Sequence, residues 1–196
     1  MSPCDTRTMS SKKLLDRGGP WTEEEFLALE ETSTRIELID GSLLVSPAPH
    51  RRHQDISARL WLSVFASAEA TGLQARQAVN VRLGPRTIVI PDLVVESARE
   101  GGIVEDASNV LLACEITSPS NAATDRFGKM HFYADARIPW YLLVEPDFDG
   151  YKSVTLRLFR LAEKKYVPHK IAEPGETLTS DKPFPFSIST DDLRVY

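Results

Sequence analysis

The chain has 196 residues, a hydrophobic fraction of 42%, a charged fraction of 26% and a formal net charge of −5 at pH 7. These values are typical of a soluble globular protein with one sizeable core, and the negative charge argues mildly against broad, nonspecific attraction to nucleic acid. No apolar run approaches the roughly 20 residues of a membrane helix. Two cysteines, Cys4 and Cys114, form neither a disulfide framework nor a zinc set, which indicates a cytoplasmic protein.

The first 19 residues lack the apolar core of a signal peptide and predict a mobile tail, followed by a single domain over residues 20–196. Thr22 and Glu25 form a capping box that predicts a helix through about Glu31. Asp40-Gly41 lies between two alternating runs, which is the strongest short signal for a β-hairpin. The strands of that hairpin are predicted at Arg35–Ile39 and Ser42–Ser46.

Apolar residues recur at helical spacing between Arg51 and Ala70, and Gly72 predicts the end of that helix. Val110–Ile116 is a continuous apolar strand, expected at the centre of a sheet and buried on both faces. Further strands are predicted at Gln74–Leu83, Thr87–Val95, Trp140–Val144, Val154–Arg160 and Lys165–Ile171, the last two as a hairpin at the sheet edge.

A helix from about Ala122 to Ala136 separates two buried strands and predicts a right-handed βαβ unit. Pro183 and Pro185 predict an irregular segment, and Asp191–Leu193 a last helical turn. The fold class expected is α/β, of the mixed α+β kind, with a mixed sheet flanked by helices.

Two acidic residues lie inside apolar, strand-like runs: Asp92 in Ile-Pro-Asp-Leu-Val-Val and Glu115 in Leu-Ala-Cys-Glu-Ile-Thr. Burying an unpaired carboxylate is costly, and two carboxylates on neighbouring strands can share that burden by binding a hard cation such as Mg²⁺. Such an ion can activate water and stabilise charge on a phosphate. The two acids therefore predict metal-dependent phosphodiester hydrolysis.

On the helix that follows Glu115, Asp125, Lys129 and Tyr133 share one face. A helix packed back over the sheet would point Lys129 at the Asp92–Glu115 pair, where an ammonium group can position water or stabilise phosphate charge. The alternatives are ordinary ones. Asp92 is then a turn residue, Glu115 a solvated strand end, and Asp125–Lys129 a surface ion pair of little energetic value.

Several short motifs follow one another in a set order: Glu24-Glu-Phe-Leu-Ala-Leu, Arg35-Ile-Glu-Leu-Ile-Asp-Gly, His53-Gln, Pro91-Asp-Leu-Val-Val, Glu115-Ile-Thr-Ser-Pro-Ser, Asp125-Arg-Phe-Gly-Lys-Met-His-Phe-Tyr and Ile138-Pro-Trp-Tyr-Leu-Leu-Val-Glu-Pro. Together they resemble the Uma-two family of restriction-endonuclease-like proteins. The resemblance covers about Trp21 to Asp192, nearly the whole of the predicted domain.

This resemblance implies a restriction-endonuclease-like core with a PD-(D/E)XK site. Asp92 matches the first acid of that motif and Glu115 the second, while Thr117 stands where the lysine is usual. In the family a lysine on the next helix is thought to substitute, which maps onto Lys129, and an acid in the first strand maps onto Glu37. The metal, Mg²⁺ with Mn²⁺ as a substitute, would be held by Asp92, Glu115 and the backbone carbonyl of Ile116.

Two residues keep an ordinary interpretation beside the functional one. Glu37 is either a second acid of the site or a solvated strand residue. His53 lies near His50, Arg51 and Arg52 at a helix start that could meet a phosphate, and we interpret it as part of an ordinary exposed helix start.

The function expected is a Mg²⁺-dependent endonuclease acting on nucleic acid, with DNA as the first choice and RNA left open. The alternative is an inactive, nuclease-derived module that binds nucleic acid or protein. A purely structural sheet protein whose acids are ion-paired is a third, weaker alternative. No membrane partner is expected, and a homodimer is one option because many nucleases cut both strands as dimers.

Overall fold

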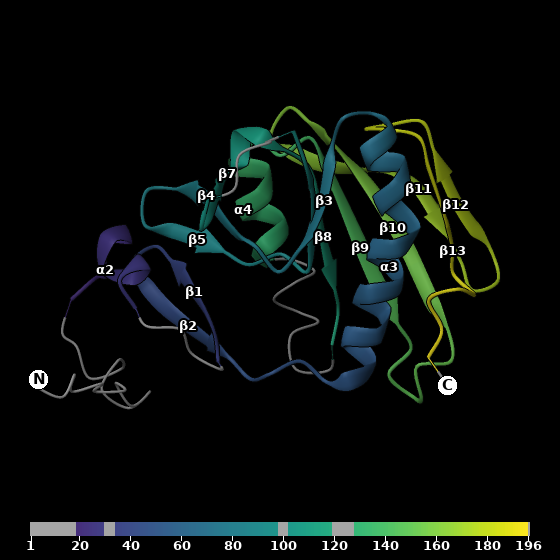
Figure 1. Cartoon of the computed structure of the whole chain (residues 1–196), viewed down its shortest axis with the longest axis horizontal. Coiled ribbons are helices and arrows are strands. Elements are labelled where there is room, and N and C mark those ends of the chain that lie inside the picture. Colours follow the sequence, from purple (N-terminus) through teal and green to yellow (C-terminus); the bar gives the residue numbers. More distant parts are fainter. Residues whose placement is uncertain (1–18, 30–33, 98–101, 119–127, 196) are drawn as a thin grey trace, which may run out of the picture. The chain divides into compact units, whose positions relative to one another are not determined.

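A computed structural model describes residues 19–29, 34–97, 102–118 and 128–195 (Figure 1). The chain folds into two compact units. Unit 1 comprises Met1–Ala48 and Gly84–Val89, and unit 2 comprises Pro49–Leu83 and Ile90–Tyr196. The predicted tail lies outside the described residues except for Gly19.

Unit 1 begins with a short helix fixed by its cap. In α2 (Glu23–Leu27), Thr22 Oγ1 accepts a hydrogen bond from the Glu25 N–H, and the Glu25 carboxylate accepts one from the Thr22 N–H. The predicted capping box is therefore confirmed. The helix ends at Leu27, with Ala28 as its C-cap, and so does not continue to the predicted Glu31.

The hairpin predicted around Asp40-Gly41 is confirmed with its boundaries. Strand β1 (Arg35–Ile39) pairs antiparallel with β2 (Ser42–Ser46). Asp40 and Gly41 have φ of 49° and 82°, the positive values that a two-residue hairpin turn requires. Strand β5 (Thr87–Val89) pairs with β1 through Ile88 and Leu38.

Unit 2 is built on a six-stranded sheet in the order β11-β10-β9-β8-β6-β3. The central strands β8 (Val110–Ile116) and β9 (Trp140–Pro146) are parallel, as the predicted βαβ unit requires. Antiparallel strands flank this pair on both sides: β3 (Gln74–Gln77), β6 (Leu93–Glu96), β10 (Val154–Ala162) and β11 (Lys165–Ala172). The mixed sheet and the edge hairpin β10–β11 confirm the sequence predictions.

Both long strands predicted between residues 74 and 95 are interrupted. Ala78 has a φ of 50°, which separates β3 from β4 (Asn80–Gly84). Pro91, which has no N–H for a ladder, lies in the gap between β5 and β6. Strand β4 pairs in parallel with β7 (Val104–Asp106), a strand followed by the short helix η1 (Ala107–Asn109), and neither β7 nor η1 was predicted.

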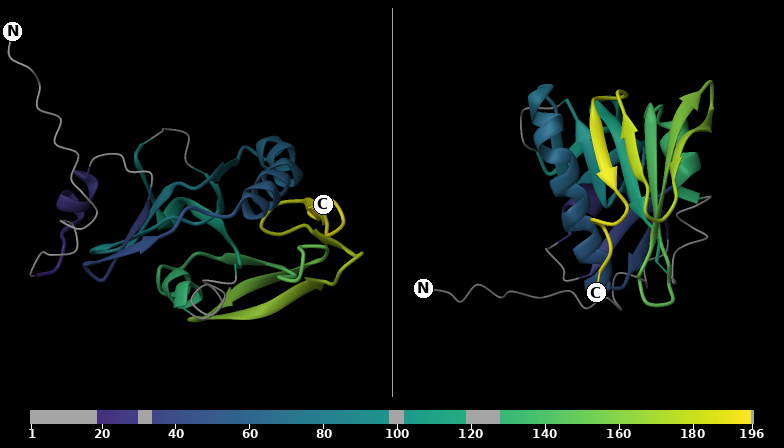
Figure 2. Two further views of the ribbon diagram at one scale, coloured as in Figure 1. Left: turned by 90° about the horizontal axis from the view of Figure 1, so that it is seen from below. Right: turned by 90° about the vertical axis from the view of Figure 1, so that its right-hand side faces the viewer.

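Two helices cover opposite faces of the six-stranded sheet. Helix α3 (Arg51–Ala70) has its predicted bounds, and its buried stripe packs in a core with Leu93, Cys114 and Leu142. Helix α4 (Met130–Asp135) lies on the other face, where Tyr133 meets Tyr141. Strand residues alternate between faces, so Leu142 and Tyr141 point in opposite directions. Figure 2 shows the strands between the two helices. The predicted helix start near Ala122 lies outside the described residues.

The C-terminal part is more regular than predicted. Strands β12 (Thr177–Ser180) and β13 (Phe186–Ser189) form an antiparallel hairpin where the prolines predicted an irregular segment. Asp191–Leu193 forms a turn instead of the predicted helical turn. Leu178, Phe184 and Ile188 of this region join the core beneath α3. Among the described residues, no helix is long and apolar enough to span a membrane.

We predict that Gly41→Ala destabilises unit 1. A Cβ at Gly41 would lie 2.9 Å from the Pro20 Cβ, and the φ of 82° disfavours any side chain. The expected loss in free energy of unfolding is about 1 kcal/mol or more, measured by chemical denaturation. Gly84→Ala is the matched control, because a Cβ there meets no atom within 4 Å. Equal stability of the two variants would contradict the prediction.

Candidate active site

Asp92 directly precedes β6, and Glu115 lies near the end of the neighbouring strand β8. Strands β6 and β8 pair antiparallel, and Leu93 opposite Cys114 is the pair of this ladder that lies next to the two acids. Cys114 and Ile116 point into the core beneath α3, so Glu115 between them points to the face covered by α4. Both acids are buried, with exposed fractions of 5% and 1%. Glu115 is therefore not a solvated strand end, and Asp92 lies at a bend but is buried.

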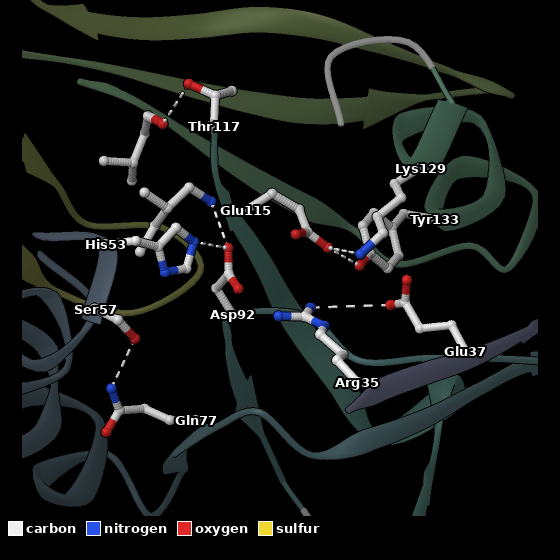
Figure 3. A network of polar contacts seen from close by, with 12 residues as sticks. Arg35, Glu37, His53, Ser57, Gln77, Asp92, Glu115, Thr117, Lys129 and Tyr133 are labelled. Carbon is white, nitrogen blue, oxygen red and sulfur yellow. Dashed lines mark hydrogen bonds and ion pairs between the residues drawn. The ribbon is translucent and has the colours of Figure 1, made fainter. Parts of the chain in front are cut away.

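The carboxylate of Asp92 is held from two directions (Figure 3). Its Oδ2 accepts a hydrogen bond of 2.7 Å from the backbone N–H of Ile116 in β8. The same oxygen lies 3.2 Å from Nε2 of His53, which is in the first turn of α3. The Asp92 N–H bonds to the Cys114 carbonyl, so the regular ladder ends at Leu93 and the strand departs from its register at Asp92.

The carboxylate of Glu115 is held by α4. Its Oε1 lies 3.2 Å from Nζ of Lys129 and 2.5 Å from the hydroxyl of Tyr133, which donates to it. Lys129 directly precedes α4 and Tyr133 is four residues further along, so both side chains reach the strand from one helical face. A buried carboxylate thus has one cationic and one neutral donor.

The alternative in which Lys129 is a surface residue is wrong. Its exposed fraction is 5%, and its partner is the buried Glu115. Asp125, the other residue of the surface pair considered above, lies outside the described residues. Thr117, which stands at the usual lysine position, is also buried, and its hydroxyl lies 3.4 Å from the Val144 carbonyl on β9. The ammonium group of this site therefore comes from α4 and not from β8.

The backbone at Ile116 is oriented toward Asp92. The Ile116 N–H points to Asp92, whereas the next N–H, that of Thr117, points to Val144 on the opposite neighbour. In an extended strand the N–H and C=O of one residue point to the same side, so the Ile116 carbonyl also faces the strand of Asp92. Both oxygen-bearing groups, the Ile116 carbonyl and the Asp92 carboxylate, therefore lie between β8 and the chain that leads into β6.

Cys114 reports on the charge of the site. Its thiol is buried in the core, and burial is the main cause that raises its pKa well above the ordinary value. The neighbouring carboxylates of Asp92 and Glu115 raise this pKa further. No group of three or more His, Cys, Asp or Glu side chains gathers as a metal cluster within the described residues.

Glu37 belongs to β1 in unit 1. It is buried, with an exposed fraction of 1%, and lies 3.9 Å from the guanidinium of Arg35. The interpretation of Glu37 as a solvated strand residue is therefore wrong. Its assignment to the catalytic site stays a prediction.

His53 is a site contact that the sequence interpretation missed. The exposed helix start expected there is wrong, because His53 is 8% exposed and bonds to Asp92. The signal was present: His53 precedes Ile56 by three residues and Leu60 by seven, which places it on the buried stripe of α3. Arg51 does lie exposed, and His50 caps the helix by accepting the Arg52 N–H.

Comparisons with known proteins identify the family and the fold. The model of the Uma2 family, described as "Putative restriction endonuclease", matches residues 23–195. The chain belongs to the Uma2 family. A crystal structure described as a "putative nuclease belonging to DUF820" from Anabaena variabilis is similar to this Uma2 protein, with a TM-score of 0.70 and 20% identity over 89% of this chain and 97% of that chain. This likeness confirms the restriction-endonuclease-like fold. No curated protein matches the chain.

We predict that Tyr133→Phe destabilises this Uma2 protein by about 1–3 kcal/mol. The change removes a donor from the buried Glu115 carboxylate and keeps the packing of the ring. Tyr166→Phe is the matched control, because it removes a hydroxyl that donates to a neutral acceptor, the Ile138 carbonyl at 2.7 Å. Urea denaturation should give the larger loss for Tyr133→Phe. A loss no greater than that of Tyr166→Phe would contradict the role assigned to the hydroxyl.

Proposed function

We propose that the protein is a Mg²⁺-dependent nuclease that hydrolyses phosphodiester bonds, with DNA as its substrate. The observation that carries this proposal is a pair of buried carboxylates: Glu115, which lies beside the Lys129 ammonium group, and Asp92, which binds the N–H of the residue after Glu115. Membership of the Uma2 family supports hydrolysis of nucleic acid. The choice of metal and of DNA is our own.

The residues present suit a hard divalent cation. Mg²⁺ prefers carboxylate and carbonyl oxygens and keeps part of its water shell, and Asp92, Glu115 and the Ile116 carbonyl supply such oxygens. These three groups would hold the ion. When bound, Mg²⁺ supplies Lewis-acid stabilisation of the phosphate and of the leaving oxygen.

The chain's own groups then have distinct tasks. His53 and the Ile116 N–H fix the carboxylate of Asp92 by binding one of its oxygens. The hydrogen bond requires that His53 carry its proton on Nε2 when the ring is neutral. Lys129, placed at the edge of Glu115, orients the attacking water and stabilises the charge that develops on the phosphate. Tyr133 holds the carboxylate of Glu115 in place for this ammonium group.

We predict cleavage of a mixed panel of linear and circular DNA in millimolar Mg²⁺ or Mn²⁺, and none in EDTA. Asp92→Asn and Glu115→Gln should each lower the rate by at least a hundredfold, because each removes a charged ligand. Inactivity of the wild-type protein on DNA and RNA, with metal bound, would favour the inactive binding module instead. Light scattering from the wild-type protein under the same conditions tests the homodimer option.

Divalent metal should also raise the stability of the wild-type protein. An ion that binds only the folded state adds about 2.7 kcal/mol at a concentration 100 times its Kd. The melting temperature should therefore rise with Mn²⁺ concentration in the wild-type protein and stay constant in Asp92→Asn. A wild-type melting temperature that does not respond to Mn²⁺ would remove the metal from the proposal.

Lys129→Met should abolish cleavage and destabilise the metal-free protein by roughly 3–5 kcal/mol, because Glu115 would remain buried without its cation. Added Mn²⁺ should restore part of that stability, since the ion compensates Glu115. Lys165→Met, at an exposed position of β11, is the matched control and should change neither quantity. Full cleavage by Lys129→Met would exclude Lys129 from the mechanism.

A further inference from the structure

A second polar site lies on unit 2, away from Asp92 and Glu115. A pocket of about 260 Å³ opens between the β3–β4 connection, the end of β6 and the start of β7. Its lining includes Arg76, Asn80, Glu96, Ile103 and Glu105. Ligand pockets commonly enclose about 300–1,000 Å³, so this one suits a single small ring system rather than a large cofactor.

Glu96 is the unusual residue of this pocket. Its exposed fraction is 1%, and its Oε1 accepts a hydrogen bond of 2.5 Å from Arg76 Nε. Its second oxygen, Oε2, is buried and bonds to no described residue. A buried acceptor left without a donor is costly and rare in folded proteins. Oε2 therefore marks a position at which a donor is needed.

The charges around Glu96 define the kind of donor. Desolvation raises the pKa of Glu96, the hydrogen bond from Arg76 lowers it, and the nearby Glu105 raises it again. Arg76 already supplies the cation for this carboxylate, so the partner that suits Oε2 is a neutral donor, such as an amino N–H group, and not a further full charge. A metal ion is disfavoured because it needs several oxygen ligands and would face the guanidinium.

Arg76 supplies hydrogen-bond donors beside the acceptor Glu96 Oε2. A guanidinium has five N–H donors, and the bonds to Glu96 and Gln74 use two of them. The pocket thus offers an acceptor, Glu96 Oε2, beside donors of Arg76. Cytosine and adenine carry the matching pair, an exocyclic amino group beside a ring nitrogen, and carboxylates are known partners of the cytosine amino group. Uracil and thymine carry a carbonyl oxygen, an acceptor, at the position of this amino group.

The position of Glu96 relates this pocket to the catalytic acids. Val94 and Glu96 alternate with the core residues Leu93 and Val95, so Glu96 points away from that core, as Glu115 does on β8. Glu96 is four residue steps along the chain from Asp92, a distance of roughly 13 Å in an extended chain at about 3.3 Å per residue. A few nucleotides span this distance, at about 3.4 Å per step along a strand.

From these observations we infer that the pocket binds an unpaired cytosine or adenine base of the nucleic acid substrate, with its amino group on Glu96 Oε2 and its ring nitrogen facing Arg76. The base must be unpaired, because pairing in a duplex occupies that edge. The inference rests on the proposed function only in the choice of a nucleic acid base as the ligand.

Nucleosides test the pocket without any need for cleavage. Titration of the wild-type protein, followed by NMR, should show saturable binding of cytidine or adenosine roughly tenfold or more tighter than of uridine or thymidine. Glu96→Gln should remove this preference, because the amide can place a donor where Oε2 accepts. Glu105→Gln is the matched control and should retain the preference, because Glu105 Oε1 is bonded within the protein to the Asp106 N–H and Asn109 Nδ2.

Three outcomes would overturn the inference: no saturable binding of any nucleoside, equal binding of cytidine and uridine, or equal losses in Glu96→Gln and Glu105→Gln. The first means that water or a small ion satisfies Oε2, and the last means that charge alone attracts the ligand. The wild-type comparison remains decisive if Glu96→Gln does not fold. Selective binding without any cleavage would refute the nuclease proposal alone, whereas cleavage without selective binding would refute only the base pocket.

Discussion

The site depends on the burial of two carboxylates, one within a central strand and one at the bend that precedes its neighbour. Asp92 and Glu115 are nearly inaccessible to water, and each is tolerated only because donors surround it. The donors come from different directions: His53 from α3 on one face, Lys129 and Tyr133 at α4 on the other, and the Ile116 backbone from within the sheet. The two helices are therefore placed by the acids as well as by the apolar core.

The parallel pairing of β8 and β9 explains how the segment between them brings Lys129 and Tyr133 to Glu115. A parallel crossover must carry the chain back along the sheet, and the returning helix lies over one face of the strand that it has just left. Glu115, near the end of β8, is consequently beneath the helix that follows it in the sequence. The core side of the same strand, with Cys114 and Ile116, packs under α3. Because side chains alternate along β8, Glu115 faces the candidate site while Cys114 and Ile116 face the core.

Sequence patterns predicted the parts of the fold that local interactions decide. The Asp40-Gly41 turn, the stripe of α3 and the apolar run of β8 gave correct boundaries, because each has a strong signal of its own. The β12–β13 hairpin was missed, since Pro183 and Pro185 lie in the connection between strands whose pairing is not visible locally. The breaks at Ala78 and Pro91 were missed for a related reason: the residues around them favour strands, and only the pairing partners decide where a strand stops.

The acids and Lys129 were also visible in the sequence, whereas their partners were only partly so. Charge within an apolar run singled out Asp92 and Glu115, and helical spacing related Lys129 to Tyr133. His53 was assigned to the solvent because basic neighbours obscured its place on the apolar stripe of α3. Glu96 was not singled out, although it too ends an apolar strand. Its burial depends on Arg76, twenty residues earlier in the chain, and such a pairing leaves no local trace.

The position of the lysine outside β8 has a consequence for how activity would be lost. A lysine two residues after Glu115 would travel with its strand, but Lys129 keeps its place only while α4 stays docked. Short helices open locally at a lower free energy than central strands. Opening of α4 would take the cation and the tyrosine hydroxyl from Glu115 together and leave the ladder of β8 intact. Heat or mild denaturant would then inactivate this protein while its sheet is still folded, so that loss of activity precedes global unfolding.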